Sequence, residues 1–219
     1  MEWIDNKSIL SDASGFLANG FTHTLSPYSG CSFAGTLCGQ YCYAQKIWYV
    51  TKGRDWGLYG AKKNVVEAYI RQYRSIKFSK KESKPIRIFM SSVTDPYVPH
   101  EKKLQITRQL LEVMLLHPPD KLVLQTRNPL VLRDLDLLEQ LSAKCNLWVS
   151  MTIETDMVKI EGLLRHSFTP EQRFTAARTL KQADIPIQIT VAPLLPIEDL
   201  EQFTHDLDRS CHRVILDHY

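Results

Sequence analysis

Residues 121–153, KLVLQTRNPLVLRDLDLLEQLSAKCNLWVSMTI, contain the clearest structural unit of the chain. The apolar patterns of residues 121–125 and 146–153 predict two strands. Between them, Asn128 and Pro129 are typical of a helix start, as N-cap and first helical residue, and the helix is expected to reach about Ala143. A connection of this length crosses over the sheet, so the two strands are predicted to be parallel.

The same alternation extends in both directions along the chain. Further strands are expected within residues 20–26 and at residues 86–90, 185–191 and 213–216, and further helices at about 61–76, 99–117, 170–181 and 198–208. No Gly-rich phosphate fingerprint follows the first strand, which disfavours a doubly wound sheet. A closed eight-unit barrel needs about 250 residues, whereas this chain has 219. The predicted fold is therefore α/β, a (β/α)6 partial TIM-type barrel, with residues 1–219 as a single domain.

The composition is that of a globular protein. Hydrophobic residues make up 44% and charged residues 23% of the chain. No run approaches the roughly 18 apolar residues of a membrane span, and no signal sequence opens the chain. We therefore expect a cytoplasmic protein without a membrane segment. The five cysteines are an odd number, and three of them crowd into one segment, which favours metal or redox chemistry over a disulfide framework.

Positive charge is concentrated in one segment. Residues 46–87 hold twelve Lys and Arg against three Asp and Glu, a net charge of +9 in a chain whose net charge is +3. Tryptophans and tyrosines, including Trp48, Tyr49 and Tyr59, are interleaved with these charges. This pattern is typical either of a surface for a polyanion such as a nucleic acid or of a solvated helix face.

The loop of residues 27–45 carries the most specific chemistry. Cys31, Cys38 and Cys42 lie within twelve residues, and Gly30, Gly35 and Gly39 are spaced among them. Soft thiolates bind zinc, copper(I) or iron–sulfur centres. A structural zinc site needs a fourth ligand, which His23 could supply. Three cysteines without a fourth instead suit a cubane cluster with one open iron.

Six short phrases follow one another from residue 26 to residue 196: SPYSGC (26–31), YCYA (41–44), SSVTDPY (91–97), TRNPLVLRD (126–134), VSMTI (149–153) and VAPLLP (191–196). Together they resemble the radical S-adenosylmethionine (radical SAM) enzymes, in the branch similar to spore photoproduct lyase. The resemblance covers most of the chain, and the phrases fall at the expected strand ends.

The resemblance implies a cofactor set and a role for each matching residue. It implies that Cys31, Cys38 and Cys42 bind a [4Fe–4S] cluster, whose open iron chelates SAM for reductive cleavage to a 5′-deoxyadenosyl radical. An electron donor such as ferredoxin or flavodoxin is also implied. The implied SAM contacts are Tyr41 and the backbone of Ala192 at the adenine, Ser91 and Ser92 at the amino group, Arg127 at the carboxylate, and Ser150 with Thr152 at the ribose.

Two departures from the family pattern concern the chemistry. The cysteines are spaced C-x6-C-x3-C, whereas the family spacing is C-x3-C-x2-C, so the loop is expected to bulge. The hydrogen-donor cysteine of the lyase belongs near the end of the second strand, where this chain has Met90, and a thioether has no S–H to donate. Cys145 and Cys211 precede strands and are expected to be buried. We therefore expect inefficient repair of spore photoproduct.

The resulting hypothesis is a radical SAM enzyme, lyase-like in class, that acts on an unidentified substrate for which a nucleic acid is a candidate. A zinc-stabilised, non-catalytic nucleic-acid-binding protein is the first alternative, with Cys31, Cys38, Cys42 and His23 as ligands. An electron-transfer module that holds a cluster without SAM is the second.

Overall fold

The computed structural model describes residues 1–79 and 83–217. In this part of the chain the main sheet has seven strands, in the order β10-β9-β8-β7-β6-β3-β2. Its strands are β2 (Leu10–Asp12), β3 (His23–Leu25), β6 (Arg87–Met90), β7 (Lys121–Thr126), β8 (Asn146–Thr152), β9 (Ile187–Val191) and β10 (Arg213–Leu216). The strands from β3 to β10 are parallel and lie side by side in chain order, and β2 pairs antiparallel to β3 at one edge. The fold is therefore mixed α/β, as the alternation predicted.

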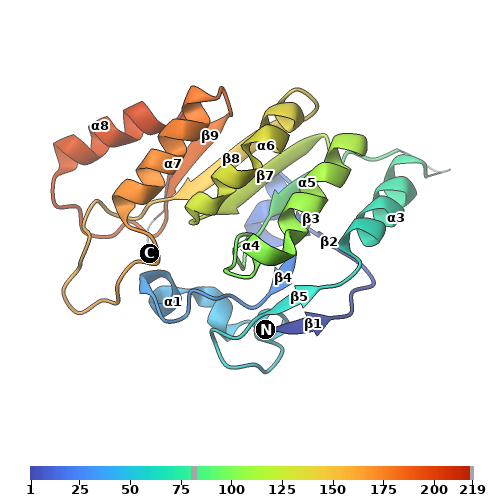
Figure 1. Cartoon of the computed structure of the whole chain (residues 1–219), viewed down its shortest axis with the longest axis horizontal. Helices are drawn as coiled ribbons and strands as arrows, with labels where there is room; N and C mark the ends of the chain where they lie inside the picture. The colour runs from blue at the N-terminus through green and yellow to red at the C-terminus, as the bar shows by residue number, and fades with distance from the viewer. Residues whose placement is uncertain (80–82, 218–219) are drawn as a thin grey trace.

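Helices cover one face of this sheet (Figure 1). They are α3 (Val65–Lys77), α5 (Ile106–Leu116), α6 (Leu135–Ser142), α7 (Pro170–Gln182) and α8 (Leu200–Ser210). The strand order does not reverse, so the sheet lacks the switch point of a doubly wound fold. None of the helices in residues 1–79 and 83–217 is long and apolar enough to cross a membrane.

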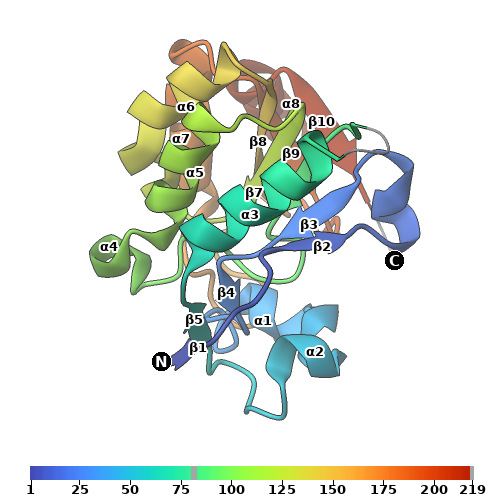
Figure 2. The same cartoon turned by 90° about the vertical axis from the view of Figure 1, so that its right-hand side faces the viewer.

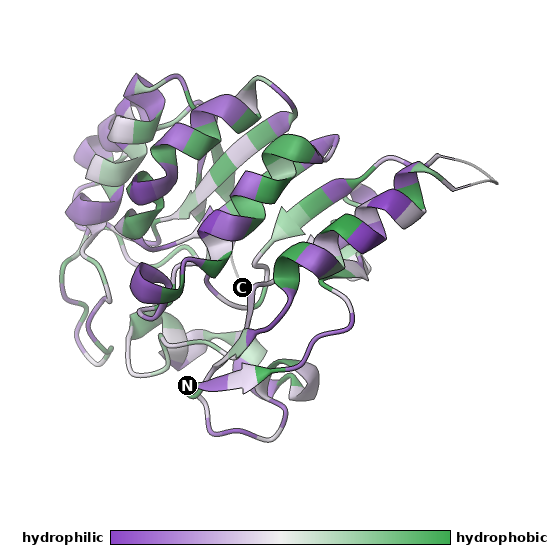
Figure 3. Ribbon diagram, turned by 45° about the vertical axis from the view of Figure 1, so that its right-hand side comes forward, coloured by the Kyte–Doolittle hydropathy of each residue, from purple (hydrophilic) through white to green (hydrophobic). Residues whose placement is uncertain are grey.

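The hydrophobic core lies between the helices and the central strands. All five residues of β9 are buried, and β7 and β8 bury most of theirs. By contrast, the residues of the edge strand β10 are all exposed. Hydrophilic and hydrophobic residues alternate around the helices that cover the sheet (Figure 3).

A second, three-stranded sheet stands beside the carboxyl end of β3. It consists of β1 (Glu2–Ile4), β5 (Gly60–Lys62) and β4 (Tyr28–Ser29), with β5 in the middle. The short helices α1 (Leu37–Tyr41) and α2 (Trp48–Thr51) lie in the same part of the molecule (Figure 2). This smaller layer carries the cysteine loop.

Two expected helices differ from the structure. The helix expected from about residue 61 begins at Val65, because Ala61 is the middle of β5 and pairs with both Trp3 and Tyr28. The helix expected after Pro99 is broken into α4 (Glu101–Leu104) and α5 at Gln105, whose φ is +53°. The carboxylate of Glu101 accepts the N–H of Thr107 at 3.1 Å and so caps α5.

Two predicted helix starts are confirmed. The side chain of Asn128 accepts the N–H of Leu130, although the first residues form a short 3-10 helix, η3 (Pro129–Asp134), before α6. At α7, Thr169 and Gln172 form a complete capping box. These caps fix where each helix leaves the carboxyl end of the preceding strand.

Candidate active site at the strand ends

The predicted SAM-binding residues lie at the carboxyl ends of the strands of the main sheet. Ser91 and Ser92 follow β6, Arg127 follows β7, Ser150 and Thr152 are in the last half of β8, and Ala192 follows β9. Tyr41, the last residue of α1, donates a 2.6 Å hydrogen bond to Glu154 just beyond β8. The carbonyl of Ser92 accepts a hydrogen bond from Tyr43 at 3.2 Å. The structure therefore brings the cysteine loop against the carboxyl ends of the strands, while the roles of these residues toward SAM stay a prediction.

Close backbone packing shapes the cysteine loop at two of its glycines. Gly30, at φ +82°, precedes Cys31, and a Cβ there would lie 2.4 Å from the carbonyl oxygen of Leu58. Gly39, next to Cys38, lies so close to Ala34 that a Cβ would come within 2.3 Å of its backbone. Gly35 has no such neighbour. Two of the three predicted glycine positions therefore permit the path of the loop.

The three thiols lie near one another and near Arg127. A hydrogen bond between Cys38 and Cys42 raises the pKa of Cys38 and, with it, lowers the pKa of Cys42 to about 6. Burial raises the pKa of Cys31 to about 12. The charge of Arg127 lowers the pKa of all three thiols, so it favours their thiolate forms.

The donor set fits a cluster in its chemistry, with three soft ligands from one loop. Within residues 1–79 and 83–217, however, no group of three or more His, Cys, Asp or Glu side chains is arranged to hold a metal ion. His23, the predicted fourth zinc ligand, instead contacts Thr22 at 2.8 Å and faces Asp12. The zinc set of the alternative reading is thus not assembled in the structure.

A buried carboxylate that the sequence reasoning missed connects these elements. Glu154 accepts hydrogen bonds from Tyr41, from Arg127 Nε at 2.8 Å and from Arg173 Nη1 at 2.5 Å, and it is only 1% exposed. Burial would raise its pKa, but the charges of Arg127 and Arg173 outweigh burial and lower the pKa to about 2. Glu154 is therefore ionised at neutral pH.

The spacing of polar residues at the end of β8 could have indicated Glu154 from the sequence. Ser150, Thr152 and Glu154 follow one another at intervals of two, the spacing of residues on one face of an extended chain. The matching phrase ended at Ile153, one residue before Glu154. Arg173 gave no such signal, because it lies inside α7, where an arginine is normally exposed, yet it is 2% exposed.

The backbone at Arg127 is held by a second buried carboxylate. Asp95 accepts the N–H of Arg127 at 2.9 Å, the N–H of Tyr97 at 2.8 Å and the hydroxyl of Thr126 at 2.9 Å. These bonds join the loop after β6 to the end of β7. Asp95 thus has a structural role that accounts for its burial.

Two buried hydroxyls of the predicted set have no partner. In the described part of the chain, neither Ser91 Oγ nor Thr152 Oγ1 makes a hydrogen bond. Buried polar groups are normally paired, so unpaired ones at a strand end indicate a place for a polar ligand. Ser150 differs, because its hydroxyl bonds with Thr190 at 2.8 Å and accepts from Gln188 at 3.1 Å.

The remaining cysteines do not join the site. Cys145 immediately precedes β8, and Cys211 precedes β10 and donates to the carbonyl of Leu207. Both lie at the amino ends of their strands, as expected from the sequence. Met90 ends β6 and is completely buried.

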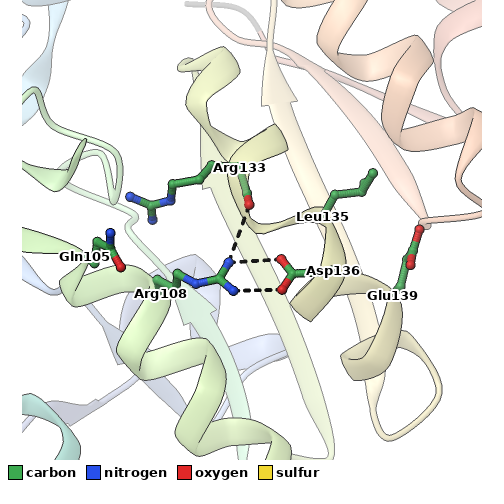
Figure 4. Close-up of a pocket in the computed structure, with 6 residues that line it drawn as sticks. All are labelled: Gln105, Arg108, Arg133, Leu135, Asp136 and Glu139. Carbon is green, nitrogen blue, oxygen red and sulfur yellow. Dashed lines mark hydrogen bonds and ion pairs between the residues drawn. The ribbon is translucent and has the colours of Figure 1, made fainter. Parts of the chain in front are cut away.

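A separate hollow on the helical side is lined by α5, η3 and α6 (Figure 4). Its cations are already neutralised, since Arg108 pairs with Asp136 at 2.7 Å and with Asp134 at 3.1 Å. Arg133 pairs with Glu101 at 2.8 Å and with Asp134 at 2.7 Å. This hollow therefore resembles a structural ion-pair network rather than an anion site.

Solved structures of two enzymes share this architecture. A mutant of spore photoproduct lyase superposes with a TM-score of 0.69 at 16% identity, over 95% of this chain and 57% of the lyase. The chain has the fold of the radical SAM enzymes. A second mutant of the lyase, with bound AdoMet and dinucleoside spore photoproduct, matches with a TM-score of 0.59 at 18% identity, over 85% of this chain and 50% of that one. The cobalamin-dependent radical SAM enzyme OxsB matches with a TM-score of 0.53 at 16% identity, over 88% of this chain and 27% of OxsB.

Two relatives in sequence carry the name of an uncharacterized protein. Protein MJ0683 of Methanocaldococcus jannaschii is 31% identical over 186 residues, which cover 81% of this chain and 62% of that protein. Protein ORF301 of Acidianus two-tailed virus is 31% identical over 163 residues, covering 70% of this chain and 51% of that protein. This chain therefore spans about half to three fifths of the length of these relatives. No protein-family model matches the chain.

Proposed function

We propose that the chain is a radical SAM enzyme with a (β/α)6 partial barrel, in which Cys31, Cys38 and Cys42 hold a [4Fe–4S] cluster. The single observation that carries this proposal is the position of the three thiols beside Arg127 at the carboxyl edge of a radical SAM fold. The unreversed strand order of the sheet supports the proposal of an open barrel. When bound, the cluster and SAM would supply a 5′-deoxyadenosyl radical after one-electron reduction, and ferredoxin or flavodoxin is the class of donor.

The residues at the strand ends would bind and orient SAM. Arg127 supplies a cation for the carboxylate of SAM. The unpaired hydroxyls of Ser91 and Thr152 can each form a hydrogen bond with a polar group of SAM. Tyr41, held by Glu154, lies next to Cys42 and would border the adenine. Ser91 and Thr152 are buried and Tyr41 and Arg127 are partly buried, which limits the access of water to the place where the radical would form.

Metal analysis tests the cluster. Anaerobically reconstituted protein is expected to contain about four irons with matching sulfide, and Cys42→Ala should lose them. Cys211→Ala is the matched control, because this cysteine lies at the opposite end of its strand and should leave iron content unchanged. Stoichiometric zinc without sulfide after anaerobic purification would contradict the proposal and favour the zinc alternative.

A nucleic acid is the class of substrate or partner that we propose. Trp48 and Tyr49 on α2 are 75% and 66% exposed and lie between Lys46 and Lys52, just after the cysteine loop. Other cations of the basic segment are already paired, as Lys77 is with Asp120 and Lys63 with Asp5. Phosphate contacts release counterions, so binding should weaken steeply with salt. Salt-independent binding or none at low ionic strength would leave the segment as a solvated face.

The proposed reaction class is lyase-like, without efficient repair of spore photoproduct. A lyase-like reaction on spore photoproduct would need a thiol beside SAM, and Met90 at the end of β6 offers none. A reduced, SAM-supplied incubation with a spore-photoproduct dinucleotide should therefore give little thymine dinucleotide. Multiple-turnover recovery would show that another hydrogen donor replaces the missing thiol.

A further inference from the structure

The side chain of Arg127 is held on one side only. Its Nε donates to Glu154 Oε1 at 2.8 Å, and no hydrogen bond from its two terminal nitrogens to protein is found in the described part of the chain. The side chain is 20% exposed, so these nitrogens lie at the border of a largely buried site. A guanidinium held at Nε keeps one edge free for a two-point contact with a carboxylate.

Glu154 is itself fixed from behind. Its Oε2 accepts from Arg173 Nη1 at 2.5 Å, and the same nitrogen donates to the carbonyl of Thr152 at 2.7 Å. Arg173 Nη2 lies 3.0 Å from His166 Nδ1. The carboxylate of Glu154 therefore has little freedom, because helix α7 and strand β8 both determine its position.

The free edge of Arg127 can pair with an anion. Arg127 and Arg173 both bond to the carboxylate of Glu154, and Tyr41 contributes a neutral hydroxyl. Asp95 and the three thiols also lie near Arg127, but within the described residues no hydrogen bond joins them to its terminal nitrogens, so this edge is open to an incoming carboxylate. Arg173 is fully enclosed, whereas Arg127 has the free edge, which makes Arg127 the partner of that anion.

We propose that Glu154 is a positioning residue that fixes the guanidinium of Arg127 so that its free edge receives the carboxylate of SAM. Glu154 acts through Arg127 and makes no contact with SAM itself. This inference rests on the proposed function, since it names the residue that organises the SAM site. It also explains the burial of Arg173, which lies on α7 and holds Glu154 in place.

A double-substitution cycle tests this role. We would measure SAM affinity by equilibrium dialysis in anaerobically reconstituted wild type, Glu154→Gln, Arg127→Lys and the double variant. Each single substitution should weaken SAM binding about tenfold, because a charge-assisted contact is lost or misplaced. The double variant should bind SAM about as weakly as Arg127→Lys alone, because Glu154 has no effect without the guanidinium fork. Additive losses would contradict the inference.

Controls separate this role from a structural one and from failure of the proposed function. Iron content and thermal unfolding are measured for every variant, and Glu139→Gln, an exposed glutamate on α6, should bind SAM as wild type does. If Glu154→Gln does not fold, Glu154→Asp keeps the charge but moves it away from Arg127 Nε, and it should also weaken SAM binding several-fold. Wild-type affinity in a folded, iron-loaded Glu154 variant would overturn the inference. Lack of SAM binding by iron-loaded wild type would instead overturn the proposed function.

Discussion

Loss of Arg127 should affect SAM binding and leave cluster binding intact. It lowers the pKa of the three thiols from nearby, yet it is no metal ligand. We expect Arg127→Ala to weaken SAM binding at least about tenfold, since a carboxylate partner is lost, and to leave iron content unchanged. Equilibrium dialysis and iron analysis of the same sample check this. Arg178→Ala, a control on the surface of α7, should change neither, and wild-type SAM affinity in Arg127→Ala would refute the carboxylate assignment.

Thr152 and Ser150 should respond in opposite ways to loss of their hydroxyls. The hydroxyl of Thr152 is buried without a partner, so Thr152→Val should raise the free energy of unfolding or leave it unchanged, while SAM binding weakens. Ser150 bonds with Thr190 and Gln188, so Ser150→Ala should cost about 1 kcal/mol of stability. Denaturant unfolding measures both. A clear loss of stability in Thr152→Val would show that its hydroxyl already has a structural partner.

Glu154 predicts a particular dependence of stability on pH. Its pKa falls from the usual 4.5 to about 2 in the folded protein, against burial, because of Arg127 and Arg173. The ionised form therefore stabilises the fold fully above pH 4.5, and this contribution is lost as the pH falls toward 2. The difference in free energy of unfolding between wild type and Glu154→Gln should shrink across this range. The charge of Glu154 raises the pKa of His166, so both proteins carry His166→Gln in this comparison, and a difference independent of pH would contradict the assignment.

Among the helices, the break between α4 and α5 depends on one side chain. Glu101 is completely buried, caps α5 through Thr107, pairs with Arg133 and accepts from Tyr28 at 2.5 Å. Glu101→Gln should destabilise the protein by about 1–3 kcal/mol, because a buried charge-assisted hydrogen bond to Arg133 is lost while Arg133 keeps its pair with Asp134. Chemical denaturation would measure this. Glu112→Gln, an exposed pair with Arg108 on α5, should cost less than about 1 kcal/mol, and equal effects would contradict the account.

Local patterns predicted most elements and failed where pairing partners were distant. The helix expected at about 170–181 and the strand expected at 185–191 rest on local signals, and both are confirmed, as α7 and β9. Ala61 has good helix propensity, but pairing with β1 and β4 places it in a strand. The break at Gln105 depends on a carboxylate four residues earlier that folds back as a cap, which helical periodicity does not reveal.

Across the whole molecule, the strand ends were predictable because parallel strands bring their carboxyl ends to one edge. The side-chain contacts that join these strand ends were not predictable from the sequence. Tyr41 and Glu154 are 113 residues apart, and Arg127 and Glu154 are 27 apart, so no local pattern indicates that they meet. The cysteine loop was recognised from its residue types, whereas the positions of its thiols depend on packing of the small sheet at Gly30 and Gly39.

If the carboxyl ends of these strands cleave SAM reductively, the two products of the cleavage can be measured. Reconstituted, reduced wild-type protein incubated with SAM should form 5′-deoxyadenosine and methionine in equal amounts, while Cys42→Ala, without its cluster, should form neither. Absence of 5′-deoxyadenosine from wild type that carries a full complement of iron and sulfide would contradict the account.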